Sequence, residues 1–141
     1  MTGAAGYEYF DVEADVGVRA WAPDEAGAFA QAALGVLALA VEPADVEERE
    51  TRDVRAQGPT PGELLVSWVN ECVYVHEIEG FAVRRVTVAG VADGVAHGVL
   101  HGEPLEPGRH RLGTVVKGVT HHRVSVAADA EHCEVRIIVD V

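Results

Sequence analysis

The spacing of hydrophobic residues predicts two short strands followed by a helix at the start of the chain. Residues 7–12 and 15–21 are expected to be strands, because apolar and polar positions alternate in the second of them. From Asp24 the apolar residues follow helical spacing, and Pro43 is expected to end the helix. Alanine and glycine dominate the rest of this segment, which suggests close packing against another element.

A second helix has recognisable signals at both ends. Thr60 suits the N-cap, Pro61 the first helical position and Glu63 the third position of a capping box, while Gly80 is expected to stop the helix. Between these ends an apolar stripe recurs at i, i+3, i+4, i+7 and i+8, formed by Leu65, Trp68, Val69, Cys72 and Val73. Trp68 is therefore expected to fill the core rather than to bind a ligand.

The remaining segments are rich in strand-forming residues. Asp93–Gly94 is typical of a hairpin turn. The expected strands are 50–57, 81–90, 94–102, 114–127 and 133–140. The resulting order, ββαβαββββ, predicts an α+β fold in which two helices pack on an antiparallel sheet. We expect residues 1–141 to form a single domain.

Composition limits the classes of partner. The chain has 141 residues, of which 48% are hydrophobic, enough for a core without disulfide or metal staples. Lys and Arg number 11 against 23 Asp and Glu, a net charge of −12, so direct nucleic-acid binding is not expected. A basic partner or bound cations would fit this charge, and so would a simple role in solubility. No oligomeric state follows from it.

Few features of the sequence indicate where in the cell the protein is located. We see neither a signal peptide nor an apolar run of membrane-spanning length, so no membrane association is expected and the cytoplasm is the default. Cys72 and Cys133 are far apart, which excludes a zinc ribbon or a thioredoxin motif. Cys72 is expected to be a buried thiol and Cys133 to lie in a turn, and a disulfide between them stays open.

Several common catalytic motifs are absent. The segment 108–113 has the glycine spacing of a phosphate loop, but no Lys-Ser/Thr pair and no helix follow it. No G-x-S-x-G occurs, so a serine nucleophile has no support. Six of the seven histidines lie between His97 and His132, yet the adjacent His121 and His122 point to opposite faces of a strand, which disfavours a zinc site.

Aspartates at strand ends are the most informative polar residues. Asp15 opens a strand with apolar alternate positions, and Asp140 interrupts an apolar run, where an aspartate is unfavourable unless it is paired or liganded. If the first and last strands are neighbours, Asp11 would join them. Converging carboxylates favour a divalent cation or a partner's Lys or Arg. The alternative is that Asp15 pairs with Arg19 and Asp140 with Arg136.

Lys117 is the only lysine in the chain. It lies in a predicted strand, where it would bind a phosphate or a carboxylate, or simply place a charge on an edge strand. Its spacing does not decide between these interpretations.

Motifs in matching order along essentially the whole chain resemble the archease family. Family members open with a segment close to Y-E-Y-L-D-H-T-A-D-V-x-x-x-A-W, then have an Ala/Phe-rich helix, an L-L-x-x-W/F-L helix, a Gly-Glu pair, an H-x-x-G-T-x-V-K-A-V-T-Y segment and a V-I-x-D-I end. The corresponding segments here are 7–21, 25–41, 64–69, 102–103, 110–121 and 137–141.

The resemblance implies an accessory protein rather than an enzyme. Archease activates the RtcB-type RNA ligase of tRNA splicing and RNA repair, promoting guanylylation of the ligase's histidine and its multiple turnover. The family's acidic divalent-metal site, for Ca²⁺, Mg²⁺ or Mn²⁺, maps to Asp15 and Asp140, with Asp11 a weaker candidate, and the lysine of its V-K-A-V-T segment maps to Lys117. The alternatives are a chaperone-like modulator of a tRNA methyltransferase, and a small metal-dependent hydrolase, for which no further nucleophile or base is evident.

The sequence departs from the family pattern beside these positions. Val12 and Glu13 replace the H-T of the H-T-A-D segment, Gly118 replaces the alanine after the lysine, and His121 replaces the tyrosine of V-T-Y. The first change removes a histidine next to the expected metal site, and Glu13 would either add a ligand or face solvent.

Overall fold

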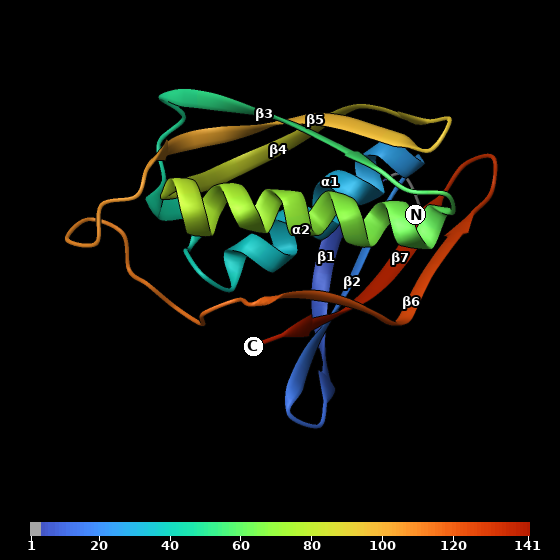
Figure 1. Ribbon diagram of the computed structural model, residues 1–141, viewed down its shortest axis with the longest axis horizontal. Helices are drawn as coiled ribbons and strands as arrows, with labels where there is room; N and C mark the ends of the chain where they lie inside the picture. The colour runs from blue at the N-terminus through green and yellow to red at the C-terminus, as the bar shows by residue number, and fades with distance from the viewer. Residues whose placement is uncertain (1–3) are drawn as a thin grey trace.

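The computed structural model describes residues 4–141 and confirms the predicted order of elements (Figure 1). The strands are β1 (Gly6–Val12), β2 (Asp15–Ala22), β3 (Glu50–Gln57), β4 (Phe81–Ala92), β5 (Val95–Pro104), β6 (Gly118–Ala128) and β7 (Cys133–Asp140). The helices are α1 (Glu25–Ala38) and α2 (Pro61–Glu79), with a short 3₁₀ turn, η1 (Pro43–Asp45). The α+β class expected from the sequence is confirmed.

The strands form two antiparallel sheets, where the sequence analysis expected one. One sheet has the order β1-β2-β7-β6 and the other the order β3-β5-β4. Both helices lie between the two sheets (Figure 1), with α1 packed on β2, β7 and β4 and α2 packed on β3, β6 and α1. The sheets are separate because β3 pairs with β5, whereas β6 and β7 return to β2.

Helix α1 begins at an aspartate cap and is packed on more than one side. The Asp24 carboxylate accepts a hydrogen bond from the Gly27 N–H at 2.8 Å. Its small residues allow close contact: the Tyr9 hydroxyl donates to the Gly35 carbonyl at 2.7 Å, and a Cβ at Gly35 would lie 2.9 Å from the Tyr7 ring. The alanine- and glycine-rich composition is therefore a consequence of the position of α1 between two sheets.

Both predicted ends of α2 are confirmed. The Thr60 hydroxyl accepts from the Glu63 N–H at 3.2 Å and donates to the Glu63 carboxylate at 3.1 Å. Pro61 is the first helical residue, and Gly80 ends the helix in the left-handed conformation with φ 66°.

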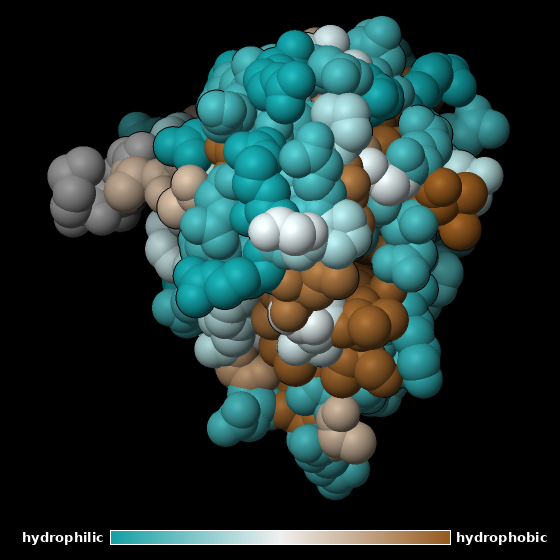
Figure 2. Space-filling view, turned by 90° about the vertical axis from the view of Figure 1, so that its left-hand side faces the viewer, coloured by the Kyte–Doolittle hydropathy of each residue, from teal (hydrophilic) through white to brown (hydrophobic). Residues whose placement is uncertain are grey.

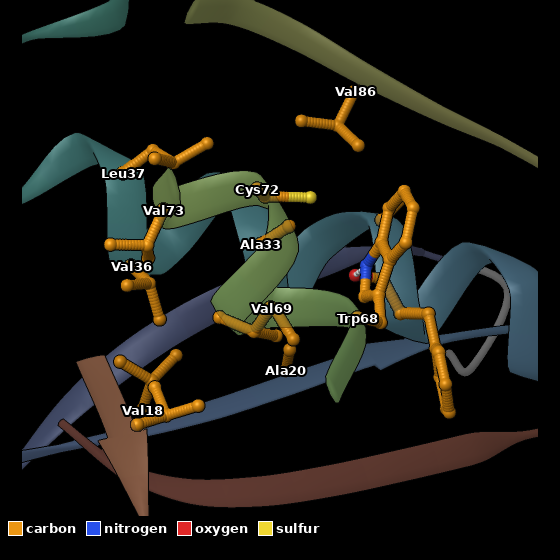
Figure 3. Packing of buried hydrophobic residues seen from close by; sticks show 14 of the residues in the cluster. Val18, Ala20, Ala33, Val36, Leu37, Trp68, Val69, Cys72, Val73 and Val86 are labelled. Carbon is orange, nitrogen blue, oxygen red and sulfur yellow. Dashed lines mark hydrogen bonds between the residues drawn. The ribbon is translucent and has the colours of Figure 1, made fainter. Parts of the chain in front are cut away.

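The helices and both sheets share one hydrophobic core, part of which is drawn in Figure 3. Trp68 of α2 is fully buried there, and its indole N–H donates to the Phe29 carbonyl of α1 at 2.9 Å, so its predicted role in the core is confirmed. Cys72 is buried in the same cluster. Cys133 is buried too, but it begins β7 instead of lying in a turn, and both cysteines are free.

The segment before β6 differs from the prediction. Residues 114–117 were expected to be strand, but β6 begins at Gly118. The N–H groups of Gly113 and Thr114 instead donate to the carbonyls of Ala40 and Leu39, at 2.7 and 2.8 Å. These carbonyls follow the end of α1 and have no partner within the helix, so the segment provides the missing donors. Neither helix in residues 4–141 has the length and apolarity that crossing a membrane would take.

Candidate functional site

The pairing of β2 with β7 places Asp15 beside Asp140. Val16 and Val139 form the last pair of this ladder. Beyond this pair, the next residue on β2 is Asp15 and the next residue on β7 is Asp140. Val139 is fully buried and Val16 packs against the core. Successive side chains of a strand alternate between faces, so both aspartates project from the outer face of the four-stranded sheet. The neighbour of the last strand is thus β2, not β1.

The arginines expected to neutralise these aspartates bind elsewhere. Arg19 pairs with Glu134 at 2.8 Å and with Glu8 at 3.2 Å, and its guanidinium stacks 4.6 Å from the Trp21 ring centre. Arg136 also pairs with Glu134, at 3.4 Å. The hydrogen bond from Arg19 lowers the pKa of Glu134 despite partial burial. Within residues 4–141, Asp15 and Asp140 make no ion pair, so the structural alternative raised from the sequence is wrong.

Asp11 lies on the other face of the sheet. It pairs with Val16 across the β1–β2 hairpin, so its side chain shares the face of Val16, which carries the core residues. Asp11 is exposed there. The structure therefore brings Asp15 and Asp140 together and leaves Asp11 apart from them. Glu13, in the hairpin turn at φ 37°, is also exposed.

Two carboxylates alone make an incomplete metal site. Among the residues that the structure describes, no group of three or more His, Cys, Asp or Glu side chains is arranged to hold a metal ion. Cross-strand neighbours on one face have Cβ atoms about 5 Å apart, and like charges at that distance repel. The pair is therefore suited to sharing a cation whose remaining ligands come from water or from another molecule.

Lys117 lies beside Asp140, and these two residues together with Asp15 are here called the corner of the four-stranded sheet. The backbone N–H of Lys117 donates to the Asp140 carbonyl at 2.9 Å, and its side chain is exposed and forms no ion pair within residues 4–141. Lys117 and Asp140 line an open groove of about 480 Å³ between α2 and the start of β6. The α2 side of this groove includes Tyr74, Glu77 and Ile78.

Asn70 fixes the position of this corner. Its side-chain amide donates to the Val119 carbonyl at 3.1 Å and accepts from the Val119 N–H at 2.8 Å, which fastens the edge of β6 to α2. A Cβ at Gly118 would lie 3.0 Å from the Asn70 side-chain oxygen. Glycine at this position thus suits the close approach of α2.

A second acidic site, which the sequence analysis assigned no role, lies at the end of β5. Glu103 is fully buried, and its Oε2 accepts from the Glu47 N–H at 2.9 Å and from His110 Nε2 at 2.9 Å. Arg49, at 3.2 Å, and Arg109 bind its other oxygen. Because His110 Nδ1 accepts from the Glu106 N–H at 2.9 Å, the ring proton is on Nε2 and points at the carboxylate.

This cluster keeps Glu103 ionised although it is buried. Burial alone would raise the pKa of Glu103, but hydrogen bonds from Arg109, the Glu47 N–H, His110 and Arg49 outweigh it and lower the pKa to about 2. The cluster ties the turn after β5 to the segment before β3. Its only sequence signal was the Gly-Glu pair and the histidine of the resembling motifs, since burial depends on residues distant in the chain.

Comparison with known proteins matches the chain from residue 7 to residue 141 to the model of the "Archease protein family (MTH1598/TM1083)". The chain belongs to the archease family. An archease of Methanopyrus kandleri is 31% identical over 138 residues, covering 96% of this chain and 99% of that protein. An archease of Sulfurisphaera tokodaii is 28% identical over 137 residues, covering 96% and 98%.

Solved structures agree with this family assignment. The solution structure of Methanobacterium thermoautotrophicum protein 1598 matches with a TM-score of 0.77 and 28% identity, covering 96% of this chain and 99% of that one. The crystal structure of an archease from Thermotoga maritima, described as a possible chaperone, matches with a TM-score of 0.57 over 95% and 96%. At 12% identity this second match shows the archease fold alone.

Proposed function

We propose that this archease-family chain is an accessory protein, without enzymatic activity of its own, that activates an RtcB-type RNA ligase. In this proposal it promotes guanylylation of the ligase's histidine and repeated turnover in tRNA splicing or RNA repair. Asp15 and Asp140 would contribute ligands to a divalent ion, and Lys117 would contact a phosphate or a carboxylate of the ligase.

The observation that carries the proposal is the corner where Asp15, Asp140 and Lys117 meet. Three charged side chains lie there without an ion pair inside residues 4–141, while the nearby arginines bind other acids. Such a corner has no evident use within the fold, because like charges side by side oppose strand pairing. It is instead available to ligands from outside the chain.

The donor set fits Mg²⁺ or Mn²⁺ better than Ca²⁺. Ca²⁺ takes about six to eight oxygen ligands, whereas Mg²⁺ keeps several waters and often binds one or two carboxylates together with phosphates. Two aspartates therefore suit an ion held jointly by this chain and a nucleotide. A bound ion would neutralise phosphate charge during transfer to the ligase's histidine.

In this proposal the side chains of this protein would bind and orient the phosphate. The backbone bond between Lys117 and Asp140 holds the lysine, just before β6, beside the end of β7, so a phosphate near the acidic pair would lie within reach of the ammonium group. The nucleophile would belong to the ligase. Among the described residues that line the groove at this corner there is no serine or cysteine, in keeping with a role that needs a partner enzyme.

The experiment is a guanylylation assay with the RtcB-type ligase from the same organism. Wild-type protein should speed formation of the ligase–GMP intermediate, and Asp140→Asn, Asp15→Asn and Lys117→Met should each lose most of this effect. Asp53→Asn, which removes an exposed carboxylate from β3 in the other sheet, is the matched control and should act like wild type.

The outcomes separate the competing functions. No acceleration by wild-type protein would contradict the proposal. Acceleration that is indifferent to Asp140→Asn would contradict the role of the acidic pair and favour the chaperone-like alternative. Turnover of a substrate by the chain alone would indicate an enzyme.

A further inference from the structure

Exposed apolar side chains gather beside the acidic corner. Five large hydrophobic residues in residues 4–141 are strongly exposed, and Tyr9 is accounted for by its hydrogen bond to Gly35. The other four are Tyr74, Ile78, Leu112 and Val115, with exposed fractions of 54, 65, 59 and 67%. Figure 2 shows that apolar residues cluster in the lower half of this side of the molecule, among polar surroundings.

These four residues, here called the apolar patch, form one surface. Tyr74 and Ile78 are one turn apart on α2 and line the 480 Å³ groove with Lys117 and Asp140. Leu112 and Val115 line a second hollow of about 180 Å³, and Glu77 borders both hollows. The patch is thus continuous with the candidate site. Exposed apolar clusters of this kind mark interaction sites.

The segment that carries half of the patch is held in place. Residues 112–115 have no regular secondary structure, but backbone bonds to the end of α1 and the buried Val116 fix them. The buried Glu103–His110 pair anchors the turn before them. Leu112 and Val115 are therefore exposed by an ordered backbone, which lowers the entropy lost on binding.

Acidic residues and cations both lie around the patch: Lys117 lines the groove, and Arg111, beside Leu112, pairs with Asp45 at 3.7 Å. Glu77 and Asp140 border the groove without an ion pair in the described part of the chain, and the whole chain carries a net charge of −12. A protein that binds RNA and a nucleotide presents Lys and Arg around its phosphate sites. Glu77, Asp140 and the net negative charge complement such a surface, and the net charge would repel a second copy of this equally acidic chain.

From this arrangement we infer that the apolar patch is the surface that docks on the ligase, and that its occupant is an apolar segment flanked by Lys or Arg. The inference rests on the proposed function and deepens it. The patch supplies affinity, while Asp15, Asp140 and Lys117 act on the bound nucleotide. Docking and activation are then separable by mutation.

The test titrates each variant into a fixed amount of ligase and follows guanylylation. Ile78→Glu and Val115→Glu should each raise the half-maximal concentration at least about tenfold, as loss of one interface hot spot does, with maximal activation recovered at saturation. Asp140→Asn should lower the maximum instead. Ala89→Glu, which introduces the same charge at an exposed position of β4, is the control and should leave the titration unchanged. Circular dichroism and melting temperature check that each variant folds.

A charge-reversal variant tests whether the negative charge beside the patch contributes to docking. Glu77→Lys should weaken activation several-fold at low salt and less at high salt, because surface charges are screened. Glu131→Lys, the same charge change in the turn before β7, should not. Equal weakening by both variants would attribute the effect to net charge and overturn the local role of Glu77 in docking.

Failure of the inference is distinct from failure of the proposed function. Wild-type half-maximal concentrations for Ile78→Glu and Val115→Glu would overturn the docking surface while activation stands. If wild-type protein does not activate, sedimentation with the ligase decides: binding that Ile78→Glu abolishes supports the surface, and no binding overturns it. A wild-type dimer that Ile78→Glu converts to monomer would assign the patch to a second copy and overturn the inference.

Discussion

Two acidic sites in this chain differ in how their carboxylates are satisfied. Glu103 is buried and receives hydrogen bonds from two arginines, a histidine and a backbone N–H. Asp15 and Asp140 lie side by side on an outer sheet face with no ion pair inside residues 4–141. The first site uses its charge to join segments of the fold, whereas the second leaves its charge available.

This difference distinguishes an acid that stabilises the fold from acids that the fold leaves unpaired. A carboxylate that stabilises the fold has its donors within the chain, so removing it leaves those donors unpaired. A carboxylate without internal donors contributes little to stability, and removing it relieves repulsion. Mutation of the two sites should therefore affect stability and binding in opposite ways.

The largest effect on stability is expected for Glu103→Gln. Every partner of this carboxylate is a donor, so the amide NH₂ of glutamine would face donors in a buried site. We expect a loss of about 3 kcal/mol in the free energy of unfolding, against a change within about 0.5 kcal/mol for Asp140→Asn. Urea unfolding followed by circular dichroism measures both. Equal losses in the two variants would remove the distinction between the sites.

The same residue should give the chain an acid-dependent stability. Its pKa lies at about 2, below the ordinary value of 4.5, so between these values the folded state binds fewer protons than the unfolded chain. The contribution of Glu103 is complete above about pH 4.5 and is lost as pH falls toward 2. Glu103→Gln should therefore show a shallower loss of stability in acid than wild type. Parallel curves for both proteins would contradict this coupling.

Mutations of Asp15 and Asp140 are expected to affect stability less than Glu103→Gln, and metal binding more. Calorimetric titration of Mg²⁺ and Mn²⁺ should show binding that Asp15→Asn and Asp140→Asn each weaken at least about tenfold, because each would remove a ligand of the proposed site. Asp11→Asn, on the opposite face, should bind like wild type. No binding by wild-type protein would mean that the chain alone forms no site, and that any ion is held jointly with the ligase or not at all. Binding that depends on Asp11 would contradict the assignment of faces.

Local patterns in the sequence were sufficient for the order and type of the elements, but not for residues 114–117, which precede β6 instead of belonging to it. The caps at Thr60 and Gly80 and the apolar stripe through Trp68 depend on residues a few positions apart, and all were confirmed. The alternation in the strands also identified Asp15 and Asp140 as out of place. The family followed from motifs in order along the chain, which a sequence contains directly.

Only the tertiary structure decided which distant residues meet. The sequence did not reveal that the strands divide into two sheets, that β7 pairs with β2, or that Asp11 faces away from Asp15, because register depends on contacts between segments far apart. The same holds for Glu103, whose donors come from positions 47, 49, 109 and 110. Element type is a local property of the chain, whereas the burial and the partners of a charge are set by the packing of the whole molecule.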